Sequence, residues 1–427
     1  MKGIKGNKVL LLVAILVLSA TIIFAAEQLT IYEWWTAGGE LQAITKAFQM
    51  FNEAYPNIKI IPNPIVGGGG ATLQMVLTGL LAAGMPPDTF QSLGGSSLKL
   101  YVDGGYLMPV DDIWTKENLD NVFPKMLKEM VTFNGHQYGI PMDIHRANWL
   151  FYNTKIFDQL GLTPPTNIDE LINTCATIKK QRPDLWPITL GTRDKFTAVF
   201  LFDDVLLDVA GPTVYEKYYT GQLDVQNDPN IRKAFEYYAK LVPYIYPYHG
   251  SQTWDQALGR KDWVMMAIGD FAAGYMLATG QKYGVDWDAL AIPNNVFLMI
   301  VDTFTRPKNA KDPNSTNDWL EFITQPLLEQ QFSILKGSIA PNNKVDPSTY
   351  LTPIQQEDAK DFNNPNITIV PSSIHGSLAP TNFLSDYQDV LVNFLYSPDV
   401  NRVLSQISNI MKIYNVKDAS QWFWSMQ

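Results

Sequence analysis

The segment that most restricts the fold of this chain is a short strand that runs into two tryptophans and a glycine turn. Residues 29–34 alternate with the period of two that is typical of a strand. The glycine pair at 38–39 interrupts this pattern, and apolar residues over 41–51 then recur at the spacing of a helix. Open α/β folds bind ligands at the carboxyl ends of strands, just before a helix. Trp34 and Trp35 therefore stand where such a fold places a ligand.

The tryptophan pair has two interpretations. Each indole taken alone fits a core position equally well, because tryptophan is usually well buried. Neighbouring residues in a strand face opposite sides, however, and a glycine turn exposes at least one of them. We therefore expect Trp34, Trp35 or both to form a stacking surface for a small polar ligand with an apolar face, such as a sugar.

Residues 1–26 have the layout of a secretory signal peptide. Three lysines precede an apolar run over residues 9–24, and Ala25 and Ala26 follow it. Phe24 stands where a cleavage site usually has a small residue, and the run is long enough to act as an uncleaved anchor. The sequence thus predicts an exported protein of the periplasm or cell surface, either released or tethered by this segment.

Composition narrows the class of protein further. The 427-residue chain is too long for one core, so two domains are expected. Its net charge of −10, without a basic stripe, argues against nucleic acid as a partner. Cys175 is the only cysteine, so no intrachain disulfide forms and packing must supply the stability. Its distance from the amino terminus also argues against a lipid-anchored cysteine.

Strands and helices alternate in the first part of the chain, and helices dominate the middle and the end. Four glycines at 67–70 are not followed by a Lys-Ser/Thr pair, so they predict a flexible turn rather than a phosphate-binding loop. The expected strands are 58–65, 89–91, 148–152, 264–268 and 296–301, and the expected helices include 40–54, 71–83, 230–242, 387–396 and 401–414.

The sequence carries none of the short catalytic or metal-binding motifs that would indicate an enzyme. The four histidines are never three or four residues apart, and no GxSxG or HExxH motif occurs. The adjacent carboxylates of Asp203 and Asp204 do not point at one bond, as glycoside hydrolysis requires. We expect no enzyme activity, cofactor or metal, although a glycosidase whose two acids lie far apart in sequence stays open. His145 and Arg146 are interpreted as a structural ion-pair site.

Polar side chains recur at the ends of predicted elements, where a cleft would collect them. They are Gln91, Asp270, Asp302, Lys336 and His375. Each also has a structural interpretation: Asp270 could cap a helix, Lys336 could be a solvated surface residue, and His375 could be bonded within a loop.

A series of motifs in a fixed order makes the chain resemble a known family. These are WWTAGGE at 34–40, GMPPDTFQ at 84–91, IPMDIHRAN at 140–148, TW with Gln256 at 253–256, GDFAAGYM at 269–276, VDTF at 301–304, LKGSIAP at 335–341 and IHGSLAP at 374–380. Together they are similar to the extracellular (periplasmic) solute-binding protein family 1 of sugar ABC transporters, closest to the bacterial glucose-binding proteins. The likeness covers nearly the whole chain after residue 26.

The resemblance implies an α/β, two-lobed periplasmic-binding-protein fold of type II. Mixed sheets with flanking helices would form each lobe, and the ligand cleft would lie between the lobes. The implied boundaries are 27–141 with 303–337 for the amino-terminal lobe, and 142–302 with 338–427 for the carboxyl-terminal lobe.

The resemblance also implies where a sugar is held. The family's contacts fall on Trp34, Trp35, Glu40, Gln91, Trp254, Asp302, Lys336 and His375, with Asp270 less directly involved. Two positions depart from the family's pattern, because Leu93 replaces a histidine and Phe271 replaces a frequent tryptophan. These departures leave galactose, mannose, xylose or a short oligosaccharide beside glucose.

The function that follows is that of a sugar receptor. The resemblance implies that the protein captures a monosaccharide, glucose being the first candidate, by hinge closure, and delivers it as a monomer to an ABC permease. The alternatives are a secreted carbohydrate-active hydrolase and a binding protein for a short oligosaccharide, a compatible solute or a peptide.

Overall fold

A mixed six-stranded sheet forms the centre of the computed structural model, which describes residues 27–425. The strands follow the order β11-β10-β3-β1-β2, with β6 also paired to β10. Pairing is parallel for β1 with β2 and β3 and for β10 with β11, and antiparallel for β10 with β3 and β6. The strand bounds are β1 Glu27–Glu33, β2 Ile58–Pro64, β3 Thr89–Leu93, β6 Gly139–Arg146, β10 Val296–Thr305 and β11 Thr368–Pro371.

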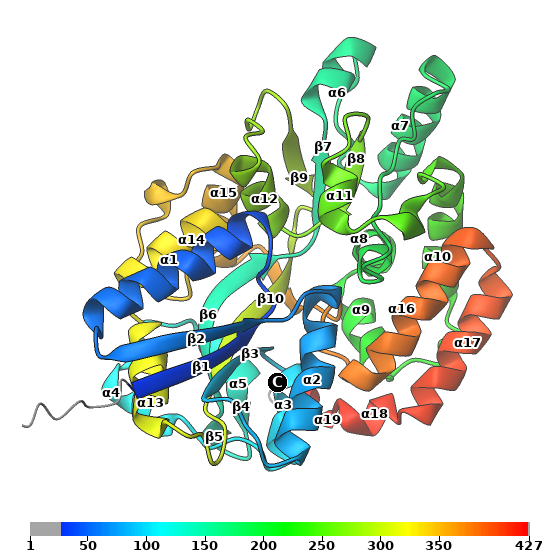
Figure 1. Ribbon diagram of the computed structural model, residues 1–427. Helices are drawn as coiled ribbons and strands as arrows, with labels where there is room; N and C mark the ends of the chain where they lie inside the picture. The colour runs from blue at the N-terminus through cyan, green and yellow to red at the C-terminus, as the bar shows by residue number, and fades with distance from the viewer. Residues whose placement is uncertain (1–26, 426–427) are drawn as a thin grey trace, which may run out of the picture.

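A second, antiparallel sheet of three strands lies beyond the carboxyl end of β6 (Figure 1). It has the order β8-β7-β9, with bounds Met265–Ile268, Trp149–Tyr152 and Asp288–Ala291. A short hairpin joins β4 (Thr132–Phe133) to β5 (His136–Gln137).

Helices divide between two hydrophobic cores. One set packs with the six-stranded sheet, where α1 and α14 lie side by side over one face (Figure 1). This set comprises α1 Gly38–Ala54, α2 Ala71–Ala82, α3 Ser96–Asp103, α4 Asp111–Lys116, α5 Lys125–Val131, α13 Pro313–Phe322 and α14 Pro326–Lys336. The other set packs with the three-stranded sheet and comprises α6 Thr154–Leu160, α7 Ile168–Gln181, α8 Thr197–Ala210, α9 Pro212–Tyr219, α10 Pro229–Leu241, α11 Trp254–Leu258, α12 Phe271–Ala278, α16 Thr381–Tyr396, α17 Val400–Ile413, α18 Val416–Ala419 and α19 Gln421–Trp424. Helix α15 (Pro353–Phe362) contributes to both cores.

Strand β10 is the wall that the two cores share. Phe297, Met299 and Val301 belong to the core of the six-stranded sheet, whereas the even-numbered neighbours Leu298 and Ile300 belong to the other core. This division follows from the alternation of side chains in a strand, which sends successive residues to opposite faces. The apolar run over residues 296–301 of β10 is what burial on both faces requires.

The predicted elements agree with the structure within a few residues over most of the chain. The predicted strand and helix around Trp34 are β1 and α1, and the glycine loop at 67–70 leads into α2 as expected. Helix α16 begins six residues before the predicted 387, at Thr381, directly after Pro380. The signal-peptide prediction for 1–26 lies outside the described residues. Within 27–425, no helix is long and apolar enough to span a bilayer.

Candidate functional site

Two adjoining cavities lie where the sheet of six strands meets the second set of helices. The larger, of about 700 Å³, has many ionisable groups in its wall, and we call it the charged chamber. The smaller, of about 470 Å³, is lined by side chains of neutral residues and by His375, and we call it the uncharged chamber. Trp34, Leu93 and His375 belong to the walls of both, so the two spaces are continuous.

The two adjacent tryptophans lie in different environments. Trp34 is partly exposed and lines both chambers, whereas Trp35 is 0% exposed and lines neither. The ring of Trp35 packs in the core, with ring centroids 5.9 Å from Phe304 and 4.9 Å from Phe332. Neighbouring residues of extended chain point to opposite sides, so only one of the pair can face the cleft. The structure therefore places Trp35 in the core and leaves Trp34 to face the cavity.

Six buried or half-buried ionisable side chains gather at the floor of the charged chamber and directly behind it. We call this group the cavity charge cluster; its members are Glu40, Asp143, His145, Asp270, Asp302 and Lys336. Four of them, Glu40, His145, Asp302 and Lys336, line the chamber itself. Three of these four were predicted from the sequence as contacts, and the structure brings them together from α1, β10 and the last residue of α14.

Lys336 is the centre of this cluster. Its Nζ lies 2.6 Å from Asp302 Oδ2, 3.1 Å from Asp143 Oδ2 and 2.7 Å from His145 Nε2. Asp302 and Asp143 are directly opposite each other on β10 and β6, an arrangement of like charges that costs stability unless a cation lies between them. The Lys336 ammonium supplies that cation.

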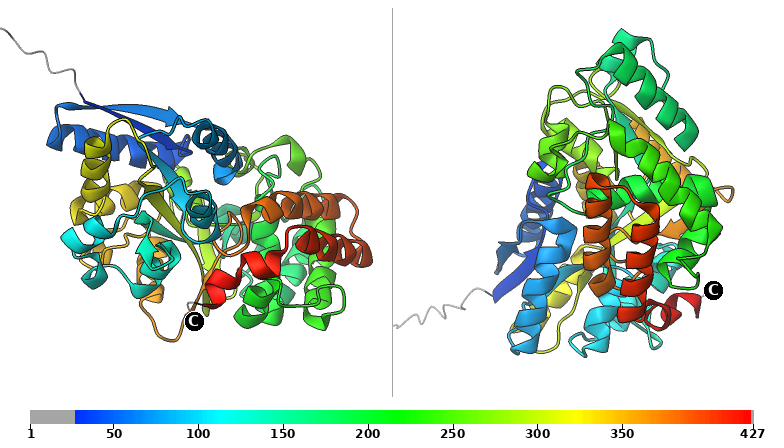
Figure 2. Two further views of the ribbon diagram at one scale, coloured as in Figure 1. Left: turned by 90° about the horizontal axis from the view of Figure 1, so that it is seen from below. Right: turned by 90° about the vertical axis from the view of Figure 1, so that its right-hand side faces the viewer.

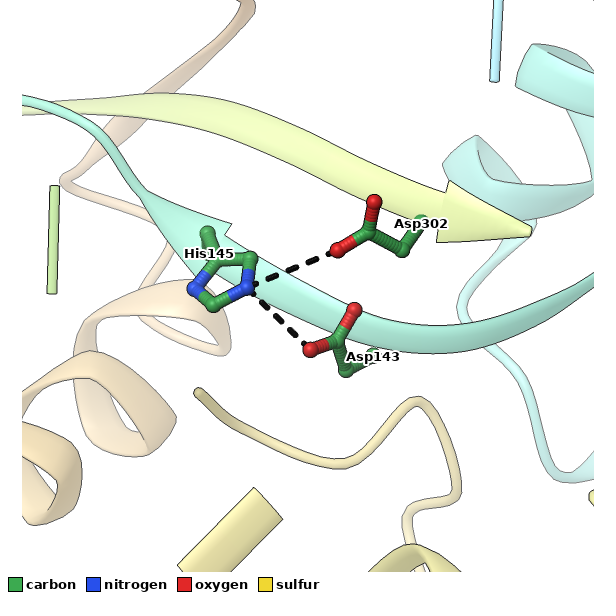
Figure 3. Close-up of side chains that lie close together, drawn as sticks. All are labelled: Asp143, His145 and Asp302. Carbon is green, nitrogen blue, oxygen red and sulfur yellow. Dashed lines mark ion pairs between the residues drawn. The ribbon is translucent and has the colours of Figure 1, made fainter. Parts of the chain in front are cut away.

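The same three neighbours of Lys336 have the composition of a metal site. Ligand atoms of Asp143, His145 and Asp302 all lie within 4.8 Å of one another (Figure 3). The ammonium of Lys336, however, contacts all three residues and would repel a second cation from this position. The residues therefore fit an internal ion-pair network better than a metal centre.

Burial and charge act against each other throughout the cluster. Burial lowers the pKa of Lys336, but Asp143, Asp302 and Glu40 outweigh it and hold that pKa above its ordinary value. Burial likewise lowers the pKa of His145, and Asp270 and other carboxylates outweigh it, so the pKa is well above the usual range. Lys336 is therefore cationic at neutral pH.

Glu40 is the cluster member whose protonation is most easily changed. Burial raises the pKa of Glu40 to about 7, with the Lys336 ammonium acting in the opposite direction. A carboxyl group that titrates near neutrality can both accept and donate hydrogen bonds. This property suits a wall that meets hydroxyl groups.

Asp270 lies behind the cavity rather than in its wall. Its side chain is 0% exposed, accepts a hydrogen bond from Arg146 N at 2.9 Å and pairs with Nδ1 of His145. It makes no side-chain cap on α12. Asp270 thus orients the His145 ring, as a carboxylate behind an imidazole does, and does not itself line either chamber.

Gln91 links the cluster to Trp34. Its Nε2 donates to Asp302 Oδ1 at 3.0 Å, and its Oε1 accepts from the backbone N–H of Trp34 at 3.1 Å. Gln91 lines the uncharged chamber, not the charged one. Gln91 thus holds both the Asp302 carboxylate and the backbone of Trp34, whose indole lies between the two chambers.

The opposite wall of the charged chamber comes from the second core. Trp254, at the start of α11, lies edge-on to Phe271 with centroids 5.2 Å apart. His375 packs edge-on to Phe196 at 4.7 Å, and burial lowers its pKa to about 4, so it is neutral at pH 7. Phe196 and Phe271 also line the charged chamber.

Two residues of the cluster were not predicted as functional from the sequence. Asp143 was not singled out, and His145 was interpreted with Arg146 as structural. Arg146 is fully buried and pairs with Asp361 at 2.9 Å, as the structural interpretation expects. His145 is also buried and pairs with Asp143 and Asp270, and in addition it lines the cavity. The strand's alternation was the available signal, because Asp143 and His145 share one face of β6 and Arg146 lies on the other.

Comparisons with known proteins agree on one family. The sequence profile described as bacterial extracellular solute-binding protein matches residues 33–326. An uncharacterized ABC transporter extracellular-binding protein of Pyrococcus horikoshii is 39% identical over 391 residues, which cover 90% of this chain and 88% of that protein. A probable sugar-binding periplasmic protein of Rhizobium meliloti is 27% identical over 387 residues, covering 89% and 92%.

Solved structures extend this likeness to the fold. The solute receptor AcbH, described as having an exclusive preference for β-D-galactopyranose, superposes with a TM-score of 0.79 at 19% identity, over 91% of this chain and 99% of its own. The likeness to such receptors confirms the predicted two-lobed α/β fold. The lobe boundaries at 141, 302 and 337 stay a prediction.

Proposed function

Because this chain belongs to the family of bacterial extracellular solute-binding proteins, we propose that it is the sugar-binding receptor of an ABC importer. In this role it captures a sugar outside the cell membrane and passes it, unchanged, to the permease. The matching family profile and a relative described as a probable sugar-binding periplasmic protein support a binding protein rather than an enzyme.

The observation that carries this proposal is the pairing of indoles and hydrogen-bonding groups in the charged chamber. A pyranose ring has an apolar face of C–H groups and a rim of hydroxyls. Trp34 and Trp254 offer aromatic surface to the face, and Glu40, Asp302 and Lys336 offer charged partners to the rim. Hydrogen bonds to charged groups contribute about 1.5–3 kcal/mol each, and a sugar with the wrong configuration leaves one of them buried and unsatisfied.

Glucose is the first sugar ring that we propose for the charged chamber, with galactose, mannose and xylose next. Leu93, Phe271 and Ile300 give the charged chamber an apolar section of wall. Leu93 and Phe271 are the two positions that depart from the glucose-binding pattern. A sugar with fewer hydroxyls on that side, such as the pentose xylose, would leave fewer groups without partners there.

We propose that the ligand acts by favouring a closed arrangement of the two lobes. Glu40 and Lys336 belong to the side of the six-stranded sheet, and Trp254 and His375 belong to the other side of the chamber. A ligand that contacts both sides binds the closed form more tightly and shifts the equilibrium toward it. The closed protein, as a monomer, would then dock on the permease.

A direct contact across the chamber supports this closure. A Cβ atom placed on Gly69 would lie 2.4 Å from the ring of His375, so the loop before α2 reaches the histidine only because residue 69 is glycine. Gln74 on α2 also donates to Thr381 Oγ1 on α16 at 2.7 Å. Both contacts join the two sides of the cleft.

A secreted hydrolase is the weaker alternative. It would need two carboxyl groups free to act on one glycosidic bond. Asp302 is bonded to both Lys336 and Gln91, which suits a fixed hydrogen-bonding wall better than a nucleophile or base.

Calorimetric titration with glucose, galactose, mannose, xylose and their disaccharides tests the proposal. We expect heat of binding with at least one sugar, and no hydrolysis product after incubation. Trp34→Ala should weaken that binding by about tenfold or more, which is at least about 1.4 kcal/mol, with little change in stability. The adjacent Trp35→Ala is the matched variant: it should cost about 3–5 kcal/mol of unfolding free energy, because Trp35 is fully buried. Absence of heat with every sugar would refute the proposal.

A further inference from the structure

The uncharged chamber is a second space beside the charged one, and the two share Trp34, Leu93 and His375. It is a space of about 470 Å³ bounded by α2, β3, α3 and the start of α16. Gln74 of α2 donates to Thr381 of α16, and Figure 2 shows these two helices in blue and orange. Its inner end is buried, at Leu73, Ser97 and Tyr101. Its outer end reaches exposed residues, Thr78 and Leu100 among them. It is therefore a passage from the charged chamber to the surface.

The lining of this passage selects for a neutral group. Among the described residues, none of those that line it is Asp, Glu, Lys or Arg. His375, at its junction with the charged chamber, is neutral at pH 7 because burial lowers its pKa to about 4. A charged substituent would lose its hydration here without gaining a partner of opposite sign, which is costly.

The lining is nevertheless not that of a purely apolar pocket. Amides and hydroxyls, such as those of Gln74, Gln388 and Thr78, alternate with the aliphatic side chains of Leu73 and Leu384. Amides and hydroxyls both donate and accept, which matches hydroxyl groups on a ligand. The mixture of apolar surface and neutral hydrogen-bonding groups fits a second sugar ring better than a hydrocarbon chain.

Trp34 connects the two spaces. Its indole lines both chambers, and its backbone is held by Gln91 from the floor of the uncharged one. A group attached to a ring in the charged chamber would pass Trp34 and His375 directly into the second space. No rearrangement of the described residues is needed to make this connection, since the two walls already share these side chains.

We infer that the ligand is a neutral saccharide of at least two rings, with one ring in the charged chamber and the next in the uncharged chamber. This inference rests on the proposed function and specifies its substrate class. It assigns to α2, α3 and α16 the role of binding the second ring, in addition to the first ring held by the charged residues of the cleft.

Titration of matched mono- and disaccharides tests the inference. The probes are glucose, galactose, mannose and xylose, each with its own disaccharides (maltose, cellobiose, galactobiose, mannobiose, xylobiose), and p-nitrophenyl glucoside as an apolar extension. We expect at least one disaccharide to bind about tenfold or more tightly than its own monosaccharide, a gain of the size that one well-fitted ring contributes.

Two variants on α2 test whether the higher affinity for a disaccharide comes from the uncharged chamber. Thr78 is exposed and lines only the uncharged chamber, so Thr78→Trp should fill the passage. Gly79 is the matched control, because a Cβ atom there meets no atom within 4 Å and the residue lines neither chamber. Thr78→Trp should remove most of the disaccharide's advantage and change monosaccharide affinity by less than about twofold, while Gly79→Trp leaves both affinities as they were.

The possible outcomes separate the inference from the proposed function. A monosaccharide that binds as tightly as every disaccharide would overturn the inference and leave the proposed function intact. A gain that survives Thr78→Trp, or one seen only with the nitrophenyl glycoside, would also overturn the assignment of a second ring. Absence of binding by all the sugars would overturn both the inference and the proposed function.

Discussion

The cavity charge cluster can be compared with a second buried ionisable group, formed by Asp203 and four tyrosines. We call the latter the tyrosine cluster; it consists of Asp203, Tyr215, Tyr218, Tyr219 and Tyr387. Asp143 in the first cluster and Asp203 in the second are both 0% exposed. Asp143 has the Lys336 ammonium 3.1 Å away, whereas Asp203 accepts hydrogen bonds from the hydroxyls of Tyr215 at 2.8 Å and Tyr219 at 2.5 Å.

The partners decide the charge of each carboxyl group. Burial raises the pKa of Asp143, but Lys336 and His145 outweigh it and hold that pKa well below its usual range. Burial raises the pKa of Asp203 to about 8, and the two tyrosine hydroxyls only partly oppose it. Asp143 is therefore ionised at neutral pH and Asp203 is mainly protonated. The carboxylate with a buried cation beside it stays charged, whereas the one with only two hydroxyl donors does not.

The two clusters also serve the cavity in different ways. The charged one forms its floor, where it can bond to hydroxyl groups. The neutral one supports the loop behind the cavity, because Tyr215 Oη accepts a hydrogen bond from the backbone N–H of Ser373 at 3.0 Å, two residues before His375. Of these two clusters, the charged one lies at the cavity and the neutral one lies behind it.

The largest effect is expected from removing the buried cation. Lys336→Met leaves Asp143 and Asp302 opposite each other without the ammonium, and we expect a loss of about 3–5 kcal/mol in unfolding free energy. Urea denaturation at pH 7 measures this loss. Lys125→Met is the control, because Lys125 pairs with Glu129 on the exposed surface and should leave the denaturation midpoint unchanged. Equal midpoints for the two variants would show that the ammonium does not hold the cluster together.

Matched amide substitutions compare the two carboxyl groups directly. Asp143→Asn removes a charge that Lys336 and His145 need, and should cost about 2–3 kcal/mol. Asp203→Asn replaces a group that is already mainly neutral, and should cost about 1 kcal/mol or less at pH 7. Urea denaturation of both variants measures the costs, and a larger cost for Asp203→Asn would reverse the assignment of charges.

The dependence of stability on pH should differ in sign between the clusters. The pKa of Asp203 is raised in the folded state, so its stabilising contribution is complete below about pH 4, the unfolded value, and is lost as pH rises through about 8. The stability of the wild type relative to Asp203→Asn should therefore fall between pH 5 and 8. The pKa of Asp143 is depressed, so its contribution is complete above pH 4 and is lost as pH falls below it.

Urea titrations of the wild type and both variants at pH 5, 6, 7 and 8 measure these slopes. The Asp143 carboxyl itself adds no slope over this range; any slope in the difference between the wild type and Asp143→Asn comes from Glu40 and His145, whose pKa values Asp143 raises. A flat difference for Asp203→Asn would mean that Asp203 is ionised in the folded protein.

The smallest effect is expected from single hydroxyl groups of the tyrosine cluster. Tyr215→Phe removes the acceptor for Ser373 N and should cost about 1 kcal/mol in stability and weaken sugar binding a few-fold, since the His375 loop loses a support. Tyr218→Phe removes only a bond to the Tyr387 hydroxyl, so it should lower stability without changing affinity. Calorimetry and urea denaturation of the pair measure both properties; equal affinities would show that the loop does not depend on Tyr215.

Local sequence patterns were enough to predict most elements and several members of the site. The period of two before Trp34 and the helical spacing after the glycine pair correspond to β1 and α1. Asp302 and Lys336 were expected at the ends of elements, Glu40 was implied by the family resemblance, and all three line one chamber. Local periodicity determines this much because it depends only on backbone geometry within a few residues.

The remaining features depend on pairings between distant segments. Only the register of β6 against β10 sets Asp143 opposite Asp302, and only the packing of α14 brings Lys336 between them. The same holds for the choice between Trp34 and Trp35, and for the uncharged chamber between α2 and α16. Periodicity shows that two residues lie on opposite faces of a strand, but tertiary packing decides which face meets the core and which meets the cavity.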